Sequence, residues 1–244
     1  MRRVWIVSHI GHCFAVLAFR QILKEQSKMT QPYTLLENGW IYRIREPETG
    51  VSHEVIILVH GWTGDENSME AFQHLFPKNA WLIAPRGIVT ASPGGYGWTQ
   101  TDLQSLSPFE QFSRPASEFR HHITALLQFL KTSTKNVNLA GFSQGAALIY
   151  TLLHLFPDWA KKAACMSGFL PPNAGSGSGA LSKFKGQVLI THGTEDKMIP
   201  VQEAWRAADA LKQAGVPVLT IIEPSGHKLG PDGAKGVKLF FNSN

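Results

Sequence analysis

The chain has 244 residues, of which 43% are hydrophobic and 17% charged, a composition typical of a globular protein with one large core. Its formal net charge of +5 is concentrated in residues 1–28, where five basic residues accompany only Glu25, so the remainder is nearly neutral. No basic stripe is left to follow a phosphate backbone, which argues against nucleic-acid binding.

Residues 1–28 form a leader that matches a signal peptide only in part. "MRRVWIVSHIGHCFAVLAF" has the basic start and apolar run of a signal peptide, but the run is too short to span a bilayer. Polar side chains interrupt it at Ser8, His9 and His12. We expect a disordered or wrongly assigned leader rather than an export signal, and a cytoplasmic protein without stable membrane insertion. Residues 29–244 are expected to form a single domain.

Short apolar runs alternate with longer segments of helical periodicity along this domain. Strands are predicted at 39–46, 54–61, 80–85, 137–140, 161–168, 187–193 and 217–223. Helices are predicted at 66–76, within 107–133 (where Pro115 could break the helix), and at 144–156, 201–215 and 230–243. The first strand alternates as an antiparallel strand does, whereas 54–61 is nearly continuously apolar, as in a central strand. This alternation indicates an α/β fold, a mostly parallel sheet with helices on both faces.

The two cysteines, Cys13 and Cys165, form no disulfide framework, and neither has a metal-ligand spacing. Cys165 lies in the apolar stretch "KKAACMSGF", which predicts a free, buried thiol. The low-complexity stretch "PPNAGSGSGALSK", residues 171–183, predicts a flexible surface loop.

The segment "NVNLAGFSQGAALIYTLLHLF" places Ser143 at the junction of a predicted strand and helix, between Gly141 and Gly145. A serine on such a tight turn projects beyond the carboxyl end of the strand, where open parallel sheets carry their chemistry. Side chains two places before and after it would collide, which explains both glycines. A glycine-rich turn with a capping serine is the alternative, but the strand-to-helix context favours a nucleophile.

A serine nucleophile needs a base, and the base needs an orienting acid. Among the ten histidines, His227 is favoured because the loop "EPSGHKLG" carries it after the last predicted strand. Asp196 in "LITHGTEDKMIP" is favoured as the acid, with Glu195 second; Asp196 could instead cap the next helix. The order Ser, Asp, His is the one expected for this topology. His60 and His192 each precede a glycine at a strand end and are expected to shape turns. The remaining histidines lie in the leader or on helices: His9, His12, His74, His121, His122 and His154.

Two backbone N–H groups are candidates for stabilising an oxyanion. The N–H of Gln144 opens the helix after the serine, and the N–H of Trp62 follows a central strand in "LVHGWTGDENS".

Taken together, "LVHGWTGDENS", "GFSQGAALIYTL", "THGTEDKMIPV" and "SGHKLG" resemble the phospholipase/carboxylesterase family of α/β-hydrolases, which includes the acyl-protein thioesterases. The resemblance runs from about residue 40 to residue 244. It implies an α/β-hydrolase fold, a triad of Ser143, Asp196 and His227, and oxyanion amides at Trp62 and Gln144. It implies no metal or organic cofactor. Family members commonly carry an aromatic pair followed by an acid in the loop that here reads "SPGGYGWTQTD", and this chain keeps only Trp98 of that pattern. Because the loop helps to shape the acyl pocket in relatives, the resemblance implies that Trp98 binds substrate. The departure from the pattern means that the acyl-chain preference of relatives is not carried over.

The segment between "CMSG" and "QVLITHG" is too short for a lid domain, so we expect an open site, covered at most by the loop 86–108. The leading hypothesis is a serine hydrolase that cleaves small carboxylic esters, or acyl thioesters, through an acyl-enzyme. A peptidase or C–C bond hydrolase would use the same triad. A non-catalytic binding protein on this fold is the third hypothesis. The sequence gives no indication of oligomeric state.

Overall fold

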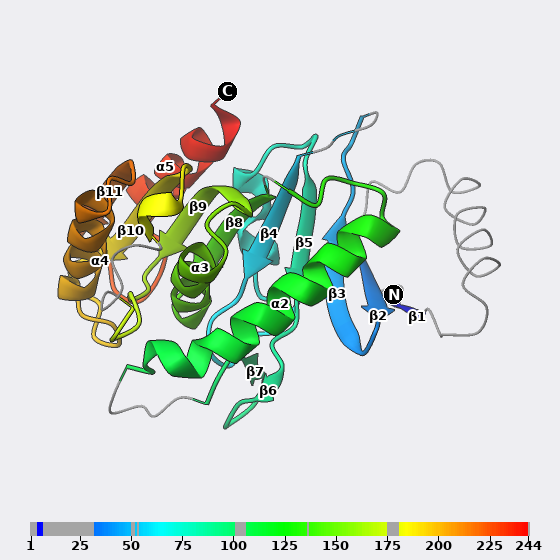
Figure 1. The fold of residues 1–244 in the computed structure, drawn as a ribbon, viewed down its shortest axis with the longest axis horizontal. Helices are drawn as coiled ribbons and strands as arrows, with labels where there is room; N and C mark the ends of the chain where they lie inside the picture. Colours follow the sequence, from blue (N-terminus) through cyan, green and yellow to red (C-terminus); the bar gives the residue numbers. More distant parts are fainter. Residues whose placement is uncertain are drawn as a thin grey trace.

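The computed structural model of the protein describes residues 4–6, 32–49, 52, 54–100, 106–135, 137–174 and 181–243. Within these residues, nine strands form one sheet in the order β1-β2-β3-β5-β4-β8-β9-β10-β11 (Figure 1). Neighbouring strands from β5 to β11 run parallel, and β3 is antiparallel to β2 and β5. The strands are β1 (Val4–Ile6), β2 (Tyr33–Glu37), β3 (Trp40–Arg45), β4 (Val55–Val59), β5 (Trp81–Pro85), β8 (Val137–Phe142), β9 (Ala160–Met166), β10 (Gln187–Gly193) and β11 (Val218–Glu223). The predicted α/β architecture with a mostly parallel sheet is confirmed.

Helices cover both faces of this sheet, and Figure 1 shows α2 and α3 crossing in front of it. One apolar core lies under α2, α3 and α4, and a second lies under η1 and α5 on the other face. The central strand β4 is buried along its whole length because it contributes alternate side chains to both cores. The elements outside the large sheet are η1 (Glu70–Leu75), β6 (Val89–Thr90), β7 (Tyr96–Gly97), α2 (Phe109–Phe129), α3 (Gln144–Leu155), η2 (Leu181–Lys183), α4 (Gln202–Gln213) and α5 (Pro231–Asn242).

The parallel strands end together at one edge of the sheet. Val59 of β4 pairs with Gly141 of β8, and the end of β10, Gly193, pairs with Glu223 at the end of β11. Loops that leave these ends can therefore meet although they are far apart in sequence. This edge carries the predicted site.

The β2–β3 hairpin adds a strand that the sequence analysis did not predict. Its turn, Asn38-Gly39, has positive φ at both residues, 51° and 78°, the conformation that matches the twist of a tight hairpin. An Asn-Gly pair between two apolar runs was the available signal. The hairpin extends the sheet on the antiparallel side.

Two helices differ from their predicted form. The segment predicted as a helix at 66–76 contains the short 3₁₀ helix η1 at Glu70–Leu75. The long helix α2 runs unbroken through Pro115, which is itself buried. The same face of α2 also buries Phe112 and Phe119, and this packing offsets the hydrogen bond that the proline ring removes.

Several other expectations concern the leader, the thiol and the lid. Apart from β1, the leader lies outside the described residues, as do residues 175–180 of the low-complexity stretch.

Cys165 is free and buried as predicted, and burial raises the pKa of its thiol to about 12. The described part of the β9–β10 connection contains η2 and turns but no lid domain. Among the described residues, no helix has both the length and the apolar character that crossing a bilayer demands.

Candidate active site

Ser143 lies on the turn between β8 and α3, where the backbone takes a strained conformation with φ 54° and ψ −119°. A Cβ on Gly141 would lie 2.7 Å from the backbone of Gly145, and one on Gly145 would lie 2.2 Å from the carbonyl oxygen of Val59. The two glycines are thus required by close backbone approach, as the sequence predicts. The Ser143 N–H donates to the Met166 carbonyl at 2.8 Å, which ties the turn to β9.

The structure brings Ser143, His227 and Asp196 together. The Oγ of Ser143 is 3.0 Å from Nε2 of His227, and Nδ1 of His227 is 2.7 Å from Oδ2 of Asp196. The serine and histidine are partly exposed, whereas the Asp196 side chain is fully buried. A buried carboxylate on one ring nitrogen leaves the other nitrogen facing the hydroxyl, which is the arrangement that removes a proton from serine.

The loop after β10 distinguishes the two acid candidates. Oδ1 of Asp196 accepts the N–H groups of Met198 and Ile199, both at 2.9 Å, so the carboxylate also holds its own loop. Glu195, the second candidate, is exposed and has its N–H bonded to the Ser225 carbonyl. The capping alternative for Asp196 is wrong, because α4 begins at Gln202 after Val201 without a side-chain cap, and Asp196 binds N–H groups of the preceding loop instead.

His192 also contacts this acid from inside the protein. Its side chain is fully buried, its Nε2 lies 2.8 Å from the Ile199 carbonyl, and the same nitrogen is 3.4 Å from Oδ2 of Asp196. The ring thereby fixes both ends of the loop that carries Asp196. Sequence analysis assigned His192 a turn-shaping role, and the structure adds this contact with the acid.

The loop that carries His227 is anchored by Glu223, which sequence reasoning missed. Oε2 and Oε1 of this buried carboxylate accept the N–H groups of Asp232 and Gly233, at 3.1 and 2.9 Å, at the start of α5. The sequence feature that could have indicated this cap is Gly230, the N-cap residue of α5, because it has no side chain with which to cap the helix. Glu223 thus caps α5 from the end of β11, and it joins the two ends of the loop that carries His227.

The two candidate oxyanion residues lie on either side of the serine. Gln144 is the first residue of α3, so its N–H and the positive end of the helix are directed at the Ser143 turn. On the other side, a Cβ on Gly61 would lie 3.2 Å from Cβ of Ser143, which places the backbone just before Trp62 against the serine. The two backbone segments thus lie beside Ser143.

Trp98 does not lie where a substrate contact was expected. Its side chain has no exposed surface, and its ring centroid is 5.0 Å from that of His60 and 5.3 Å from that of Phe119. The indole N–H donates to the His60 carbonyl at 2.7 Å. The side chain thus packs into the core behind the site instead of facing a substrate, because its indole nitrogen finds a buried acceptor there.

His60 is a structural histidine with both ring nitrogens engaged. Nδ1 lies 2.7 Å from the Gly61 carbonyl, and Nε2 accepts the Gly87 N–H at 2.8 Å. Burial lowers the pKa of His60, which agrees with a neutral ring that donates from Nδ1. As predicted, it shapes the turn after β4.

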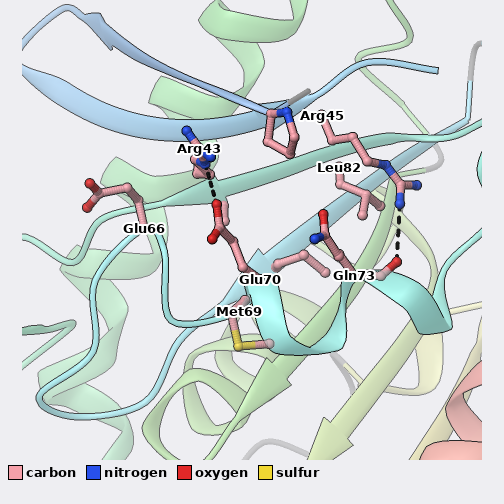
Figure 2. Close-up of a pocket in the computed structure, with 10 residues that line it drawn as sticks. Arg43, Arg45, Glu66, Met69, Glu70, Gln73 and Leu82 are labelled. Carbon is pink, nitrogen blue, oxygen red and sulfur yellow. Dashed lines mark hydrogen bonds and ion pairs between the residues drawn. The ribbon is translucent and has the colours of Figure 1, made fainter. Parts of the chain in front are cut away.

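A separate pocket lies between β3, β5 and η1 and is lined by two arginines and two glutamates (Figure 2). Figure 2 shows Arg43 directed at Glu70, and Arg45 directed at the Gln73 carbonyl. Glu66 binds Arg86 through both carboxylate oxygens, at 2.6 and 2.8 Å. Arg43 and Glu66 are thus paired with opposite charges, whereas Arg45 binds the backbone carbonyls of Gln73 and Pro77. The lining of this pocket does not include Ser143, Asp196 or His227.

No three His, Cys, Asp or Glu side chains among the described residues are grouped so that they could hold a metal ion.

Comparison with known proteins places this chain in a family. The model of the phospholipase/carboxylesterase family matches residues 42–243. Carboxylesterase SOBER1 of Arabidopsis thaliana is 28% identical over 66% of this chain and 77% of its own length. The crystal structure of a carboxylesterase from Mesorhizobium loti aligns over 87% of this chain and 99% of its own, at 20% identity and a TM-score of 0.76. A Bacillus cereus carboxylesterase aligns over 90% and 97%, at 19% identity and a TM-score of 0.72. The predicted fold is confirmed.

Proposed function

Since the chain belongs to the phospholipase/carboxylesterase family of α/β-hydrolases, we propose that it hydrolyses carboxylic esters through an acyl-enzyme formed on Ser143. One observation carries the proposal: Ser143 Oγ is 3.0 Å from His227 Nε2, and Asp196 Oδ2 is 2.7 Å from the other ring nitrogen. Nucleophile, base and orienting acid are thus within reach of one another without any rearrangement.

In the proposed first step, Ser143 Oγ bonds to the ester carbonyl carbon while its proton moves to Nε2 of His227. The carbonyl oxygen gains the electron pair and is stabilised by the N–H groups of Trp62 and Gln144. The imidazolium is held by Asp196. Collapse of this intermediate breaks the ester bond, and Nε2 returns the proton to the departing alkoxide.

In the second step, water attacks the acyl group on Ser143, with His227 removing the water proton. The same two amides stabilise the second oxyanion. The carboxylic acid leaves, and Ser143 regains its proton from the imidazolium. Every proton is carried by one ring, so no further acid or base is needed.

We propose oxygen esters and thioesters with short to medium acyl groups, or acyl groups borne on larger molecules, as substrates. The partly exposed Ser143 and His227 support this, because an exposed nucleophile admits bulky leaving groups. Rates for p-nitrophenyl esters of graded chain length, beside acyl thioesters followed by thiol release, rank these classes. A marked preference for long-chain triglycerides at a lipid interface would contradict the proposal. Peptide anilides in the same series separate an esterase from a peptidase.

A fluorophosphonate probe tests the nucleophile directly. We expect covalent labelling of the wild-type protein at Ser143, no labelling of Ser143→Ala, and a loss of ester hydrolysis by at least about 10³-fold in that variant. Intact mass and peptide mapping locate the label. Ser117→Ala, at an exposed serine of α2 whose hydroxyl donates to the Ser113 carbonyl, is the control and keeps the labelling. A wild-type protein that neither labels nor hydrolyses any ester would favour the binding-protein hypothesis.

A further inference from the structure

The two proposed oxyanion amides belong to different elements. Trp62 follows the end of β4, and Gln144 opens α3. Two donors stabilise an oxyanion only when their separation is fixed before the charge develops. Some connection across the two elements must therefore set that separation.

The side chain of Gln144 provides the first half of a connection. This buried amide accepts the Trp98 N–H through Oε1 at 2.8 Å and donates from Nε2 to the Thr99 carbonyl at 3.0 Å. It thus binds the main chain after β7 much as a neighbouring strand would, and it fixes that segment to the start of α3.

The indole of Trp98 provides the second half. Its N–H donates at 2.7 Å to the carbonyl of His60, which stands two residues before Trp62. The His60 ring is itself held at both nitrogens, by Gly61 and Gly87. A continuous run of buried hydrogen bonds therefore joins the residue after the nucleophile to the turn after β4.

A close backbone contact supports the same connection. A Cβ on Gly97 would lie 2.2 Å from the Trp62 ring and 2.9 Å from Oε1 of Gln144. The residue before Trp98 thus lies against both oxyanion residues at once, without a side chain to separate them.

We propose that the Trp98 indole and the Gln144 side chain form a bridge that sets the spacing of the two oxyanion amides, so that both are positioning residues for ester hydrolysis. The inference rests on the proposed function. It replaces the expected substrate contact of Trp98 with a role that acts through Trp62 and Gln144. The bridge contributes only when an oxyanion forms, and substrate binding does not require it.

Trp98→Phe tests the bridge, because it removes the indole N–H and keeps an aromatic ring in the core. We expect kcat to fall about tenfold, less than the loss of a whole oxyanion donor, with KM changed by less than about twofold. The affinity for a trifluoromethyl ketone, which forms an oxyanion on the serine, should fall about tenfold as well.

Trp159→Phe is the matched control. Trp159 is also buried and packs near Phe119, but its indole nitrogen has no hydrogen-bond partner among the described residues. We expect its kcat and ketone affinity to match the wild type. Equal kcat in the two variants would overturn the bridge.

Gln144→Met is a second test, should Trp98→Phe lower the yield of folded protein. It removes the side-chain hydrogen bonds to Trp98 and Thr99 and leaves the backbone N–H in place. A fall in kcat with unchanged KM supports the bridge, whereas wild-type kcat contradicts it. If the wild-type protein itself hydrolyses no ester and binds no ketone, the proposed function fails first and the bridge with it.

Discussion

At the scale of single residues, the site depends on backbone positions that admit no side chain. Gly145 has the closest approach of the pair around Ser143, because its hydrogen faces the Val59 carbonyl across the turn. The helix and the central strand are thereby held closer than any Cβ would permit. The position of Ser143 therefore depends on a residue that has no chemistry of its own.

Gly145→Ala is expected to lower the free energy of unfolding by about 2–3 kcal/mol, because the added methyl forces α3 away from β4. It should also reduce labelling of Ser143 by a fluorophosphonate, even at temperatures where the variant is fully folded. Chemical denaturation and labelling rates measure the two effects. Gly94→Ala, where a Cβ would meet nothing within 4 Å, is the control and should behave as the wild type. Equal stability of the two variants would contradict the close-contact argument.

At the scale of elements, the proposed base depends on how α5 is attached to β11. The helix begins at Pro231, and the N-cap residue before it, Gly230, has no side chain to cap it, so the Glu223 carboxylate binds the first free N–H groups. Since His227 lies between these two anchoring points, loosening the helix start also loosens the imidazole.

Glu223→Gln should lower kcat and the melting temperature together. The amide keeps one acceptor but turns a donor toward a backbone N–H, a buried mismatch that costs about 1–3 kcal/mol. Thermal unfolding and ester kinetics on one preparation measure both effects. Glu118→Gln, which removes only an exposed pair with Arg114, should leave both quantities near those of the wild type. A Glu223→Gln enzyme with wild-type kcat would show that the loop keeps His227 in place without this cap.

At the scale of the whole molecule, one buried histidine, His60, and two partly buried ones, His122 and His154, link stability to pH. Burial lowers the pKa of His60, His122 and His154, so the folded protein binds these protons less readily than the unfolded chain. The stabilisation is fully present above the unfolded pKa of about 6.5 and is lost as pH falls below it. We expect the melting temperature to be lower at pH 5.5 than at pH 7.5. His122→Gln combined with His154→Gln should reduce that difference, and an unchanged difference would refute the assignment.

The features of the site that the sequence could predict are those set by residues close together in the chain. The turn at Ser143 was predicted because its glycines and flanking periodicities lie within a few residues. Asp196 and Glu195 are adjacent, so only the fold shows that one is buried against His227 and the other exposed. The role of Trp98 depends on docking against His60, which is 38 residues away, and no local pattern records that contact.

The same limit applies to the elements. The pattern of strands and helices predicted the sheet because each core-facing run is continuous in sequence. Pro115 was expected as a position where α2 could break, yet packing of the surrounding face into the core keeps the helix continuous. Whether α2 continues through Pro115 depends on its packing against other elements, and the sequence of the helix alone does not show that packing.

Gly95 and Gly97 pack directly against the turn after β4, and this glycine seam limits how the substrate preference of the enzyme can be changed. A Cβ on Gly95 would lie 2.0 Å from the Thr63 carbonyl, so a library randomised along that seam yields mostly misfolded clones. Two apolar side chains elsewhere, Ile88 and Met198, are 41% and 65% exposed and occupy loops at the same end of the sheet. Directed evolution of this enzyme should therefore leave Gly95 and Gly97 unchanged, whereas exposed loop positions such as these two accept substitutions.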